Sequence, residues 1–265
     1  MNIIATYKDL PIAVIGDIHG DFRLLRDKIN YYQLENICLF LAGDFGCGFG
    51  HNDPREPKKE QRRLSELNDF LKKRKIFLYV IHGNHDSPDF FDGNHNFSNL
   101  IFMQDYDIVE IGEYKILGIG GATSVDRKPN HHFKDYRGHN HPGRVEGVSW
   151  WKDEKVVYNE EKLANLAGID VAITHTAPDF VYPPVLGGPV WKWCDCDPEL
   201  KNELIAERAL MSKIFNKLDE INMIKYFVYG HFHASHIEKI NTTIFKLLDI
   251  GEIYEIKFKK EEDGQ

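Results

Sequence analysis

Short runs of hydrophobic residues divide the first part of the chain at regular intervals. The runs at residues 11–15, 37–41 and 76–81 are rich in Ile, Val, Leu and Phe, which predicts buried strands. Between them, residues 22–32 and 58–74 carry hydrophobic side chains at helical spacing. This alternation of strand and helix predicts a parallel sheet with right-handed crossovers.

Further along the chain the hydrophobic runs lie closer together. The runs at 100–103, 107–111 and 114–119 favour a meander. The remaining pattern predicts a buried strand at 171–174, a helix at 198–218 and antiparallel strands at 226–229, 236–240, 243–248 and 253–258. Residues 121–148 and 176–197 show no regular pattern, and loops of that length in a compact domain usually serve function or are flexible.

Length and composition favour one globular domain. The chain has 265 residues, of which 42% are hydrophobic and 28% charged, and α/β folds often reach this length undivided. We predict a single domain over residues 1–258 and a disordered tail over 259–265. The formal net charge of −8 does not indicate binding to nucleic acid, although a local basic patch leaves that partner open.

The sequence also predicts the cellular compartment of the protein. No hydrophobic run approaches the roughly 18 residues of a membrane span, and the N-terminal residues do not resemble a signal peptide. Four cysteines in a chain of this size do not suggest a disulfide framework. We therefore expect a reduced, cytoplasmic protein without membrane association, and its oligomeric state is left open.

Polar residues gather where the predicted strands end. Five strands are followed by imidazole, carboxylate or amide side chains: Asp17 and His19, Asp44, Asn84, His175, and His231 with His233. In extended backbone, residues i and i+2 point to the same side, so the two spaced pairs should each project together. One Gly-Asp pair alone is typical of a turn. Ligands of open α/β sheets collect at the carboxyl ends of strands, so five such ends predict a shared metal site.

These residues belong to short sequence blocks that carry a resemblance. The blocks are GDIHG at 16–20, GDFG at 43–46, GNHD at 83–86, the strand-end His175 and GHFH at 230–233. In order and type they resemble the blocks of the calcineurin-like metallophosphoesterases. The resemblance implies an α/β fold, a four-layer α-β-β-α sandwich with two mixed β-sheets flanked by helices, and this agrees with the strands predicted above.

The resemblance further implies a dinuclear metal centre. Its ligands would be Asp17, His19 and His233 on one ion, Asn84, His175 and His231 on the other, and Asp44 as the bridge. Imidazole, carboxylate and amide ligands suit Mn, Fe, Zn or Ni. We expect two divalent ions per chain, with Mn as the first candidate.

Such a centre is strongly cationic and would bind a phosphate ester. By the resemblance, a hydroxide that bridges the two ions attacks phosphorus in line with the leaving oxygen. His85, next to Asn84, resembles the family histidine that protonates the leaving oxygen or steadies the transition state. Asp86 either orients His85 or is an exposed residue that starts a turn before Pro88.

The irregular segments hold further candidates. Gly120 and Gly121 begin a loop that lacks the Walker pattern, so we expect them to permit a turn towards the metal site. Arg127 and Arg137, in the same long segment, are the candidates for contact with substrate phosphate. The Lys and Arg residues of the helix at 58–74 form either a solvated face or a patch for phosphate-rich ligands.

A segment rich in tryptophan and cysteine, WKWCDC at 191–196, matches no metal or redox motif. Cys194 and Cys196 are separated by one residue, which fits neither CxxC nor a four-ligand zinc site, and no matching pair exists elsewhere. We interpret the segment as a lid on the substrate side with incidental thiols. Four loop histidines are likewise not assigned as ligands: His131, His132, His139 and His141.

The sequence thus predicts a metal-dependent hydrolase of phosphomonoesters or phosphodiesters, acting on a nucleotide, a nucleic acid or a small phosphoester. The alternative is a Ser/Thr phosphoprotein phosphatase, whose first block also reads GDIHG. Against it, the second block here lacks the Asp-Arg pair of those enzymes and the third reads GNHD where they carry GNHE. A non-catalytic scaffold is disfavoured because no ligand is missing, and a metal hydrolase acting on another bond stays open.

Overall fold

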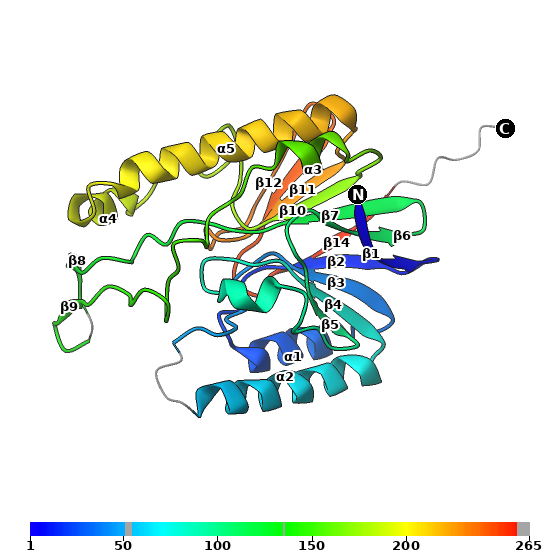
Figure 1. Cartoon of the computed structure of the whole chain (residues 1–265), viewed down its shortest axis with the longest axis horizontal. Coiled ribbons are helices and arrows are strands. Elements are labelled where there is room, and N and C mark those ends of the chain that lie inside the picture. Colours follow the sequence, from blue (N-terminus) through cyan, green and yellow to red (C-terminus); the bar gives the residue numbers. More distant parts are fainter. Residues whose placement is uncertain (51–54, 135, 259–265) are drawn as a thin grey trace.

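The structure is a computed structural model that describes residues 1–50, 55–134 and 136–258. Two β-sheets pack face to face, and helices cover the outer side of each (Figure 1). The α-β-β-α sandwich predicted from the sequence is therefore confirmed. The predicted tail at 259–265 lies outside the described residues.

One sheet has five strands in the order β14-β2-β3-β4-β5. These strands are β2 (Ile12–Ile15), β3 (Ile37–Leu41), β4 (Ile76–Val80), β5 (Leu100–Phe102) and β14 (Ile253–Ile256). Neighbours among β2 to β5 are parallel, and β14 joins β2 antiparallel. Its outer face carries α1 (Phe22–Tyr31) and α2 (Glu56–Lys73), which bury their leucine and isoleucine side chains against it.

The other sheet has seven strands in the order β1-β6-β7-β10-β11-β13-β12. These strands are β1 (Asn2–Tyr7), β6 (Asp107–Ile111), β7 (Tyr114–Ile119), β10 (Val171–Thr174), β11 (Tyr226–Tyr229), β12 (His236–Ile240) and β13 (Thr243–Leu247). Its outer face is covered by α3 (Glu160–Ala164) and α5 (Leu200–Ile221).

Burial on both faces explains the continuous hydrophobic runs in the central strands. In β3, Leu39 and Leu41 face the helices, whereas Cys38 and Phe40 face the opposite sheet. Phe40 stacks on Tyr79 of β4, with 5.2 Å between ring centroids. Because successive side chains of a strand point to opposite faces, a strand between two apolar layers shows no polar alternation.

The strand at 226–229 differs from the prediction in its direction. We expected an antiparallel strand, but β11 runs parallel to both β10 and β13. The long helix α5 precedes β11 and supplies the crossover that parallel neighbours need. Among the C-terminal strands, β12 and β14 do pair antiparallel, with β13 and β2 respectively.

The two segments without a sequence pattern contain short elements. These are β8 (Asn130–Lys134), β9 (Asn140–His141) and α4 (Val190–Cys196). All three lie at the left of Figure 1, beyond the ends of the sheets. We refer to residues 121–134, 136–150 and 182–197 as the outer loops. Within the described residues, no helix combines the length and apolarity needed to cross a membrane.

Candidate metal centre

The seven predicted ligands lie together at the carboxyl ends of β2, β3, β4, β10 and β11. Their imidazole and carboxylate atoms form two groups that share Asp44: Asp17, His19 and His233 complete one, and His175 and His231 complete the other. Within each group the donor atoms all lie within 4.8 Å of one another. Asn84 adjoins the second group, with its Oδ1 3.2 Å from His175 Nε2.

The backbone turns sharply at several of these residues. Positive φ angles occur at His19 (46°), Asp44 (53°), His231 (69°) and His233 (46°). A non-glycine residue in this region costs on the order of 1–3 kcal/mol, and such residues concentrate at functional sites. The extended i, i+2 geometry expected for these histidines is therefore wrong. The strands β2 and β11 end before them, and tight turns direct their side chains inward.

Glycines next to the ligands allow close packing around them. Gly43 has a φ of 92°, and a Cβ there would collide with the ring of His175. At Gly230, a Cβ would collide with the carboxylate of Asp17. The group that approaches the backbone at Gly230 is thus another predicted ligand, and the glycines of the sequence blocks hold the ligand-bearing turns together.

His175 is fully buried and has a fixed orientation. Its Nδ1–H donates a hydrogen bond to the carbonyl of Ala42 at 2.7 Å, and its Nε2 lies 3.2 Å from Asp44 Oδ1. A backbone acceptor on one ring nitrogen commonly orients a metal-ligating histidine. Burial alone would lower the pKa of His175, but the charges of Asp44 and Asp17 outweigh it and raise this pKa to about 10.

The donor atoms fit divalent cations. His19 Nε2 and His233 Nε2 are 2.9 Å apart, and His233 Nε2 is 3.2 Å from Asp17 Oδ2. Asp44 is 1% exposed, and its two oxygens lie towards different groups, Oδ1 near His175 and Oδ2 3.7 Å from His19 Nδ1. Nitrogen and oxygen donors that converge in this way suit first-row divalent ions.

Asp86 has a different place from either expected one. It is fully buried and accepts hydrogen bonds from the backbone N–H groups of Gly83, Phe45, Gly46 and Cys47 at 2.6–3.2 Å. Burial and the nearby charge of Asp44 raise the pKa of Asp86 to about 6, although these donors oppose the shift. The carboxyl group joins the second and third sequence blocks, so the expectation of an exposed turn residue is wrong.

The loop after β7 positions the amide of Asn84. Asn84 Nδ2 donates to Ser124 Oγ at 3.2 Å, and the N–H of Ser124 donates to Glu154 Oε1 at 2.7 Å. This contact turns Oδ1 of Asn84 towards His175. The glycine pair that begins this loop therefore leads the chain towards the site, as the sequence predicted.

A comparison with protein families finds that residues 10–235 match the calcineurin-like phosphoesterases. The match covers most of the chain and all five sequence blocks. The chain belongs to the calcineurin-like phosphoesterases.

The solved structures that match this phosphoesterase chain share little sequence with it. A phosphopantetheinyl hydrolase from Mycobacterium tuberculosis is 13% identical over 97% of this chain and 99% of its own, with a TM-score of 0.46. A dimetal phosphatase from Danio rerio is 12% identical over 92% of this chain and 88% of its own, with a TM-score of 0.45. GAP50 of Plasmodium, described as an anchor in the inner membrane complex, is 12% identical over 91% of this chain and 71% of its own, with a TM-score of 0.42. No curated protein matches the sequence.

His85 of this phosphoesterase contacts an arginine that the sequence did not single out. Arg144 Nη2 lies 2.6 Å from His85 Nε2, and Arg144 Nε pairs with Asp126 Oδ1 at 2.6 Å. The ring of His85 also stacks on Phe49, with 4.8 Å between centroids. Burial lowers the pKa of His85 to about 4, and among its neighbours Asp44 opposes the shift while Arg144 adds to it.

The two arginines proposed from the sequence lie elsewhere. Arg127 is 7% exposed, and its guanidinium pairs with Asp197 at 2.6 Å and Glu203 at 2.5 Å. These two carboxylates engage its Nε and Nη1, and Arg127 does not line the pocket beside the centre, so this geometry gives no support to a contact between Arg127 and substrate, which stays a prediction. Arg137 is exposed, lies over the ring of Tyr136 and does not line the pocket beside the centre. No sequence motif marks Arg144, because the side chains of His85 and Asp126 that it contacts lie 59 and 18 residues away in the chain.

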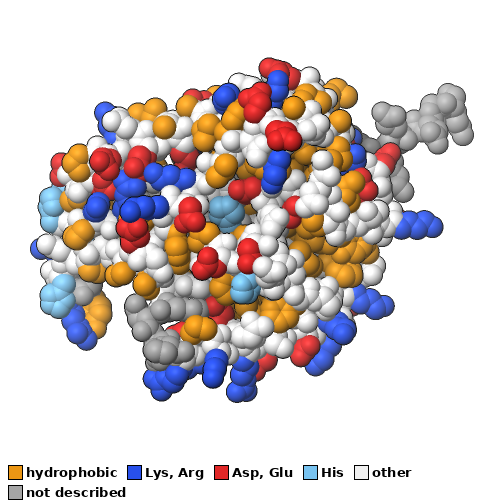
Figure 2. Space-filling view, in the orientation of Figure 1, with side chains coloured by type: hydrophobic (Ala, Val, Ile, Leu, Met, Phe, Trp, Pro, Cys, Tyr) orange, Lys and Arg blue, Asp and Glu red, His pale blue; other side chains and the backbone are white. Residues whose placement is uncertain are grey.

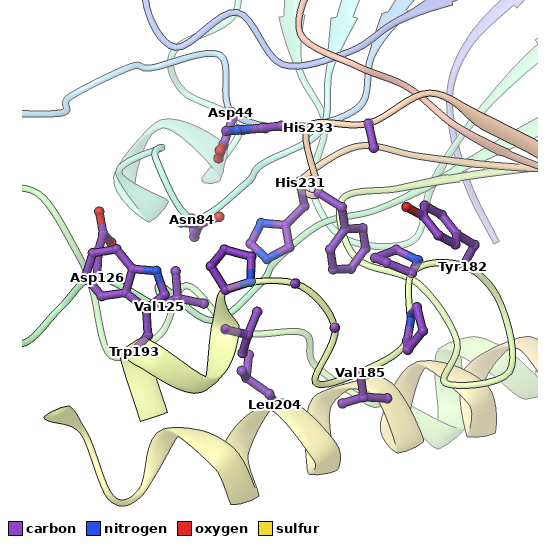
Figure 3. A pocket seen from close by; sticks show the side chains of 18 of the residues that line it. Asp44, Asn84, Val125, Asp126, Tyr182, Val185, Trp193, Leu204, His231 and His233 are labelled. Carbon is purple, nitrogen blue, oxygen red and sulfur yellow. The ribbon is translucent and has the colours of Figure 1, made fainter. Parts of the chain in front are cut away.

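A pocket of about 510 Å³ opens beside the two ligand groups. Figure 3 shows Asp44, Asn84, His231 and His233 gathered on one side of it and Val185 and Leu204 on the other. Prolines and Trp193 from the outer loops complete the apolar wall. The pocket therefore offers a polar end for a charged group and an apolar end for an organic substituent.

The basic face of α2 lies at the lower edge of Figure 2, away from this pocket. Two of its cations pair along the helix, Lys59 with Glu56 at 2.6 Å and Arg62 with Glu66 at 2.9 Å, as expected of a solvated face. Arg63 instead lines a second cavity of about 380 Å³ together with His19 and His85. One residue of the face thus reaches the surroundings of the metal centre.

Proposed function

We propose that this chain is a dinuclear metal-dependent phosphoesterase. The observation that carries the proposal is the pair of ligand groups that meet at the buried carboxylate of Asp44. The ligands would be those implied by the resemblance: Asp17, His19 and His233 for one ion, Asn84, His175 and His231 for the other, and Asp44 for both. Manganese is the first candidate for both positions.

When bound, the two ions would supply positive charge for the phosphoryl oxygens and lower the pKa of nearby water. The chain's own residues fix this site before substrate arrives. Asp86 braces the turns that carry Asp44 and Asn84, and the Ala42 carbonyl fixes the ring of His175. Such preorganisation limits the rearrangement needed when charge develops on the phosphoryl group.

His85 and Arg144 would act together on the phosphoryl group. Both line the pocket next to Asp44 and Asn84, and their side chains are in contact. Since His85 Nε2 faces the N–H donors of a guanidinium, it accepts a hydrogen bond in this arrangement rather than holding a proton for a leaving group. The pair would therefore hold and neutralise phosphoryl oxygens.

The pocket favours a small phosphoester with an apolar or aromatic substituent. Its volume of about 510 Å³ lies in the range of small-ligand sites. Val185, Trp193 and Leu204 would contact the substituent while the phosphate lies at the ligand groups. A nucleotide meets this description, whereas a phosphoprotein would leave the apolar end of the pocket unused.

A substrate panel with and without metal tests the proposal. The chain is stripped with a chelator, resupplied with Mn²⁺ and assayed on p-nitrophenyl phosphate, its bis ester, nucleotides, cyclic nucleotides and a phosphopeptide. We expect activity that depends on the added ion, two bound ions per chain and a rise in melting temperature on metal addition. Activity that survives complete removal of metal would overturn the proposal, and fastest hydrolysis of the phosphopeptide would support the phosphatase alternative.

A further inference from the structure

The outer loops bring together four metal-ligating side chains far from the dinuclear centre in sequence. His131 and His132 belong to β8, and Asp195 and Cys196 end α4. Their donor atoms all lie within 4.8 Å of one another. His132 Nε2 is 2.8 Å from Asp195 Oδ2, and His131 Nδ1 is 3.3 Å from Cys196 Sγ.

One of these distances, His131 Nδ1 to Cys196 Sγ, matches a tetrahedral zinc site, whereas His132 Nε2 and Asp195 Oδ2 are hydrogen-bonded to each other and would move apart to admit an ion. With Zn–N bonds of about 2.0–2.1 Å and a Zn–S bond of about 2.3 Å, neighbouring ligand atoms lie roughly 3.3–3.7 Å apart. Two imidazoles, one thiolate and one carboxylate are also the mixture of donors that zinc accepts. The thiol distinguishes this cluster from the dinuclear centre, whose proposed ligands include no sulfur.

Contacts between β8 and α4 place the four side chains of the cluster together without a metal ion. Phe133 stacks on Trp193 with 4.4 Å between ring centroids and an interplanar angle of 18°. Asn130 Nδ2 donates to the carbonyl of Lys192 at 2.9 Å. These contacts hold the two segments side by side, so less conformational entropy would be lost when an ion orders its ligands. Figure 2 shows histidine side chains at this edge of the molecule.

We propose that His131, His132, Asp195 and Cys196 form a third metal site, which binds a zinc-class divalent ion. The site goes beyond the proposed phosphoesterase function and does not depend on it. Its ion would tie β8 to α4, whose Val190 and Trp193 line the pocket. The site is structural in kind: it fixes one wall of the pocket and leaves the chemistry to the dinuclear centre.

Co²⁺ is the probe that distinguishes this site from the two metal positions of the proposed dinuclear centre. The chain is stripped of metal and titrated with Co²⁺, and the near-ultraviolet thiolate-to-cobalt charge-transfer absorption is recorded. We expect a band that saturates at one thiolate-bound ion per chain and disappears when Zn²⁺ is added. Cys196→Ser should abolish the band. The matched control is Cys194→Ser, a thiol on the same helix that is not in the cluster, and this variant should keep it.

Two further variants make the outcome decisive. His132→Ala should weaken cobalt binding at the sulfur-containing site, whereas Asp44→Asn, which disturbs only the dinuclear centre, should leave the band unchanged. No band in the wild-type chain, a band that persists in Cys196→Ser or one that is lost in Cys194→Ser would overturn the proposal. Circular dichroism of each variant confirms that the fold is retained, so a missing band reports on the site.

Discussion

The candidate metal centre and the outer loops are built in opposite ways. The centre consists of side chains at strand ends, and its members Asp17, Asp44 and His175 are at most 1% exposed. Their positions are fixed by backbone atoms just beyond the ends of neighbouring strands, as between His175 and Ala42. The outer loops consist of short elements, and α4 buries no residue. Contacts between side chains hold them, with Phe133 on Trp193 as one example.

This difference suggests a division of labour. A site fixed at the ends of the sheets keeps most of its geometry when the loops change, although Ser124 of these loops orients Asn84, whereas loops held by side chains can change without loss of the fold. We therefore assign metal binding to the centre and the choice of substrate to the outer loops, apart from Arg144, which belongs to these loops but contacts His85 beside the centre. Substitutions in one region should leave the defining property of the other intact, and the following predictions test that separation.

The largest effect is expected from Asp44→Asn. This carboxylate lies in both ligand groups, so the variant should weaken both metal positions and reduce turnover by roughly 10³-fold or more, since each ion contributes several kcal/mol to the transition state. Bound metal is measured by elemental analysis and turnover by steady-state kinetics. His233→Ala, which removes one terminal ligand, is the comparison and should cost less. Near-normal metal content in Asp44→Asn would refute the bridging role.

The next largest effect concerns His85 and Arg144. His85→Asn and Arg144→Ala should each lower turnover by roughly 10²–10⁴-fold, the range of groups that assist proton transfer or stabilise charge, while bound metal stays near the wild-type amount. Because the two side chains are in contact, their effects should be less than additive in a double-mutant cycle.

The control and the contrary outcome for this pair are both specific. Arg137→Ala, an exposed arginine that does not line the pocket, should retain activity. If His85→Asn affects an alkyl phosphate much more than p-nitrophenyl phosphate, His85 protonates the leaving oxygen instead, because only the alkoxide needs that proton. Loss of metal in His85→Asn would place it among the ligands.

A third prediction concerns the ion pairs of Arg127, which join two of the outer-loop segments to each other and to α5. Arg127→Met leaves the buried carboxylate of Asp197 without its cation, while Glu203 keeps its ion pair with Lys155 at 3.1 Å. Removing one partner of a buried ion pair is strongly destabilising, and we expect a loss of about 3 kcal/mol in the free energy of unfolding, measured by urea denaturation. Metal content of the folded variant should remain unchanged, because the sheets hold the centre. A turnover defect without loss of stability would support Arg127 as a substrate contact.

Much of the fold follows from the sequence because its signals are local. Residues 37–41, 107–111, 171–174 and 226–229 were predicted with the bounds that the structure shows, since buried strands are runs of hydrophobic residues bounded by glycine or polar residues. The direction of β11 was not predictable in this way, because strand pairing depends on partners elsewhere in the chain. The edge strand β1 was missed because none of its residues is buried and its pattern is weak.

The two candidate sites differ in the same way, because one carries local sequence signals and the other depends on residues far apart in the chain. The proposed ligands of the candidate metal centre stand in short blocks next to glycines, so each block signals its chemistry by itself. Arg144 and the cluster of His132 with Cys196 carry no such signal. His132 lies 63 residues from Asp195, and only the packing of β8 on α4 joins them. Sites built from loops are recognised from structure because their defining spacing exists only in space.

The smallest expected effect tests whether the outer loops select the substrate. Val185 lines the apolar side of the pocket, so Val185→Asp should place a charge where the apolar substituent of the proposed substrate would bind. We expect KM for 1-naphthyl phosphate to rise roughly tenfold, or about 1.4 kcal/mol, with little change for methyl phosphate and none in bound metal. Leu186→Asp is the matched control, because Leu186 is exposed and does not line the pocket. An equal rise for both substrates would mean that the charge disturbs the phosphate end, and the assignment of substrate choice to this wall would fail.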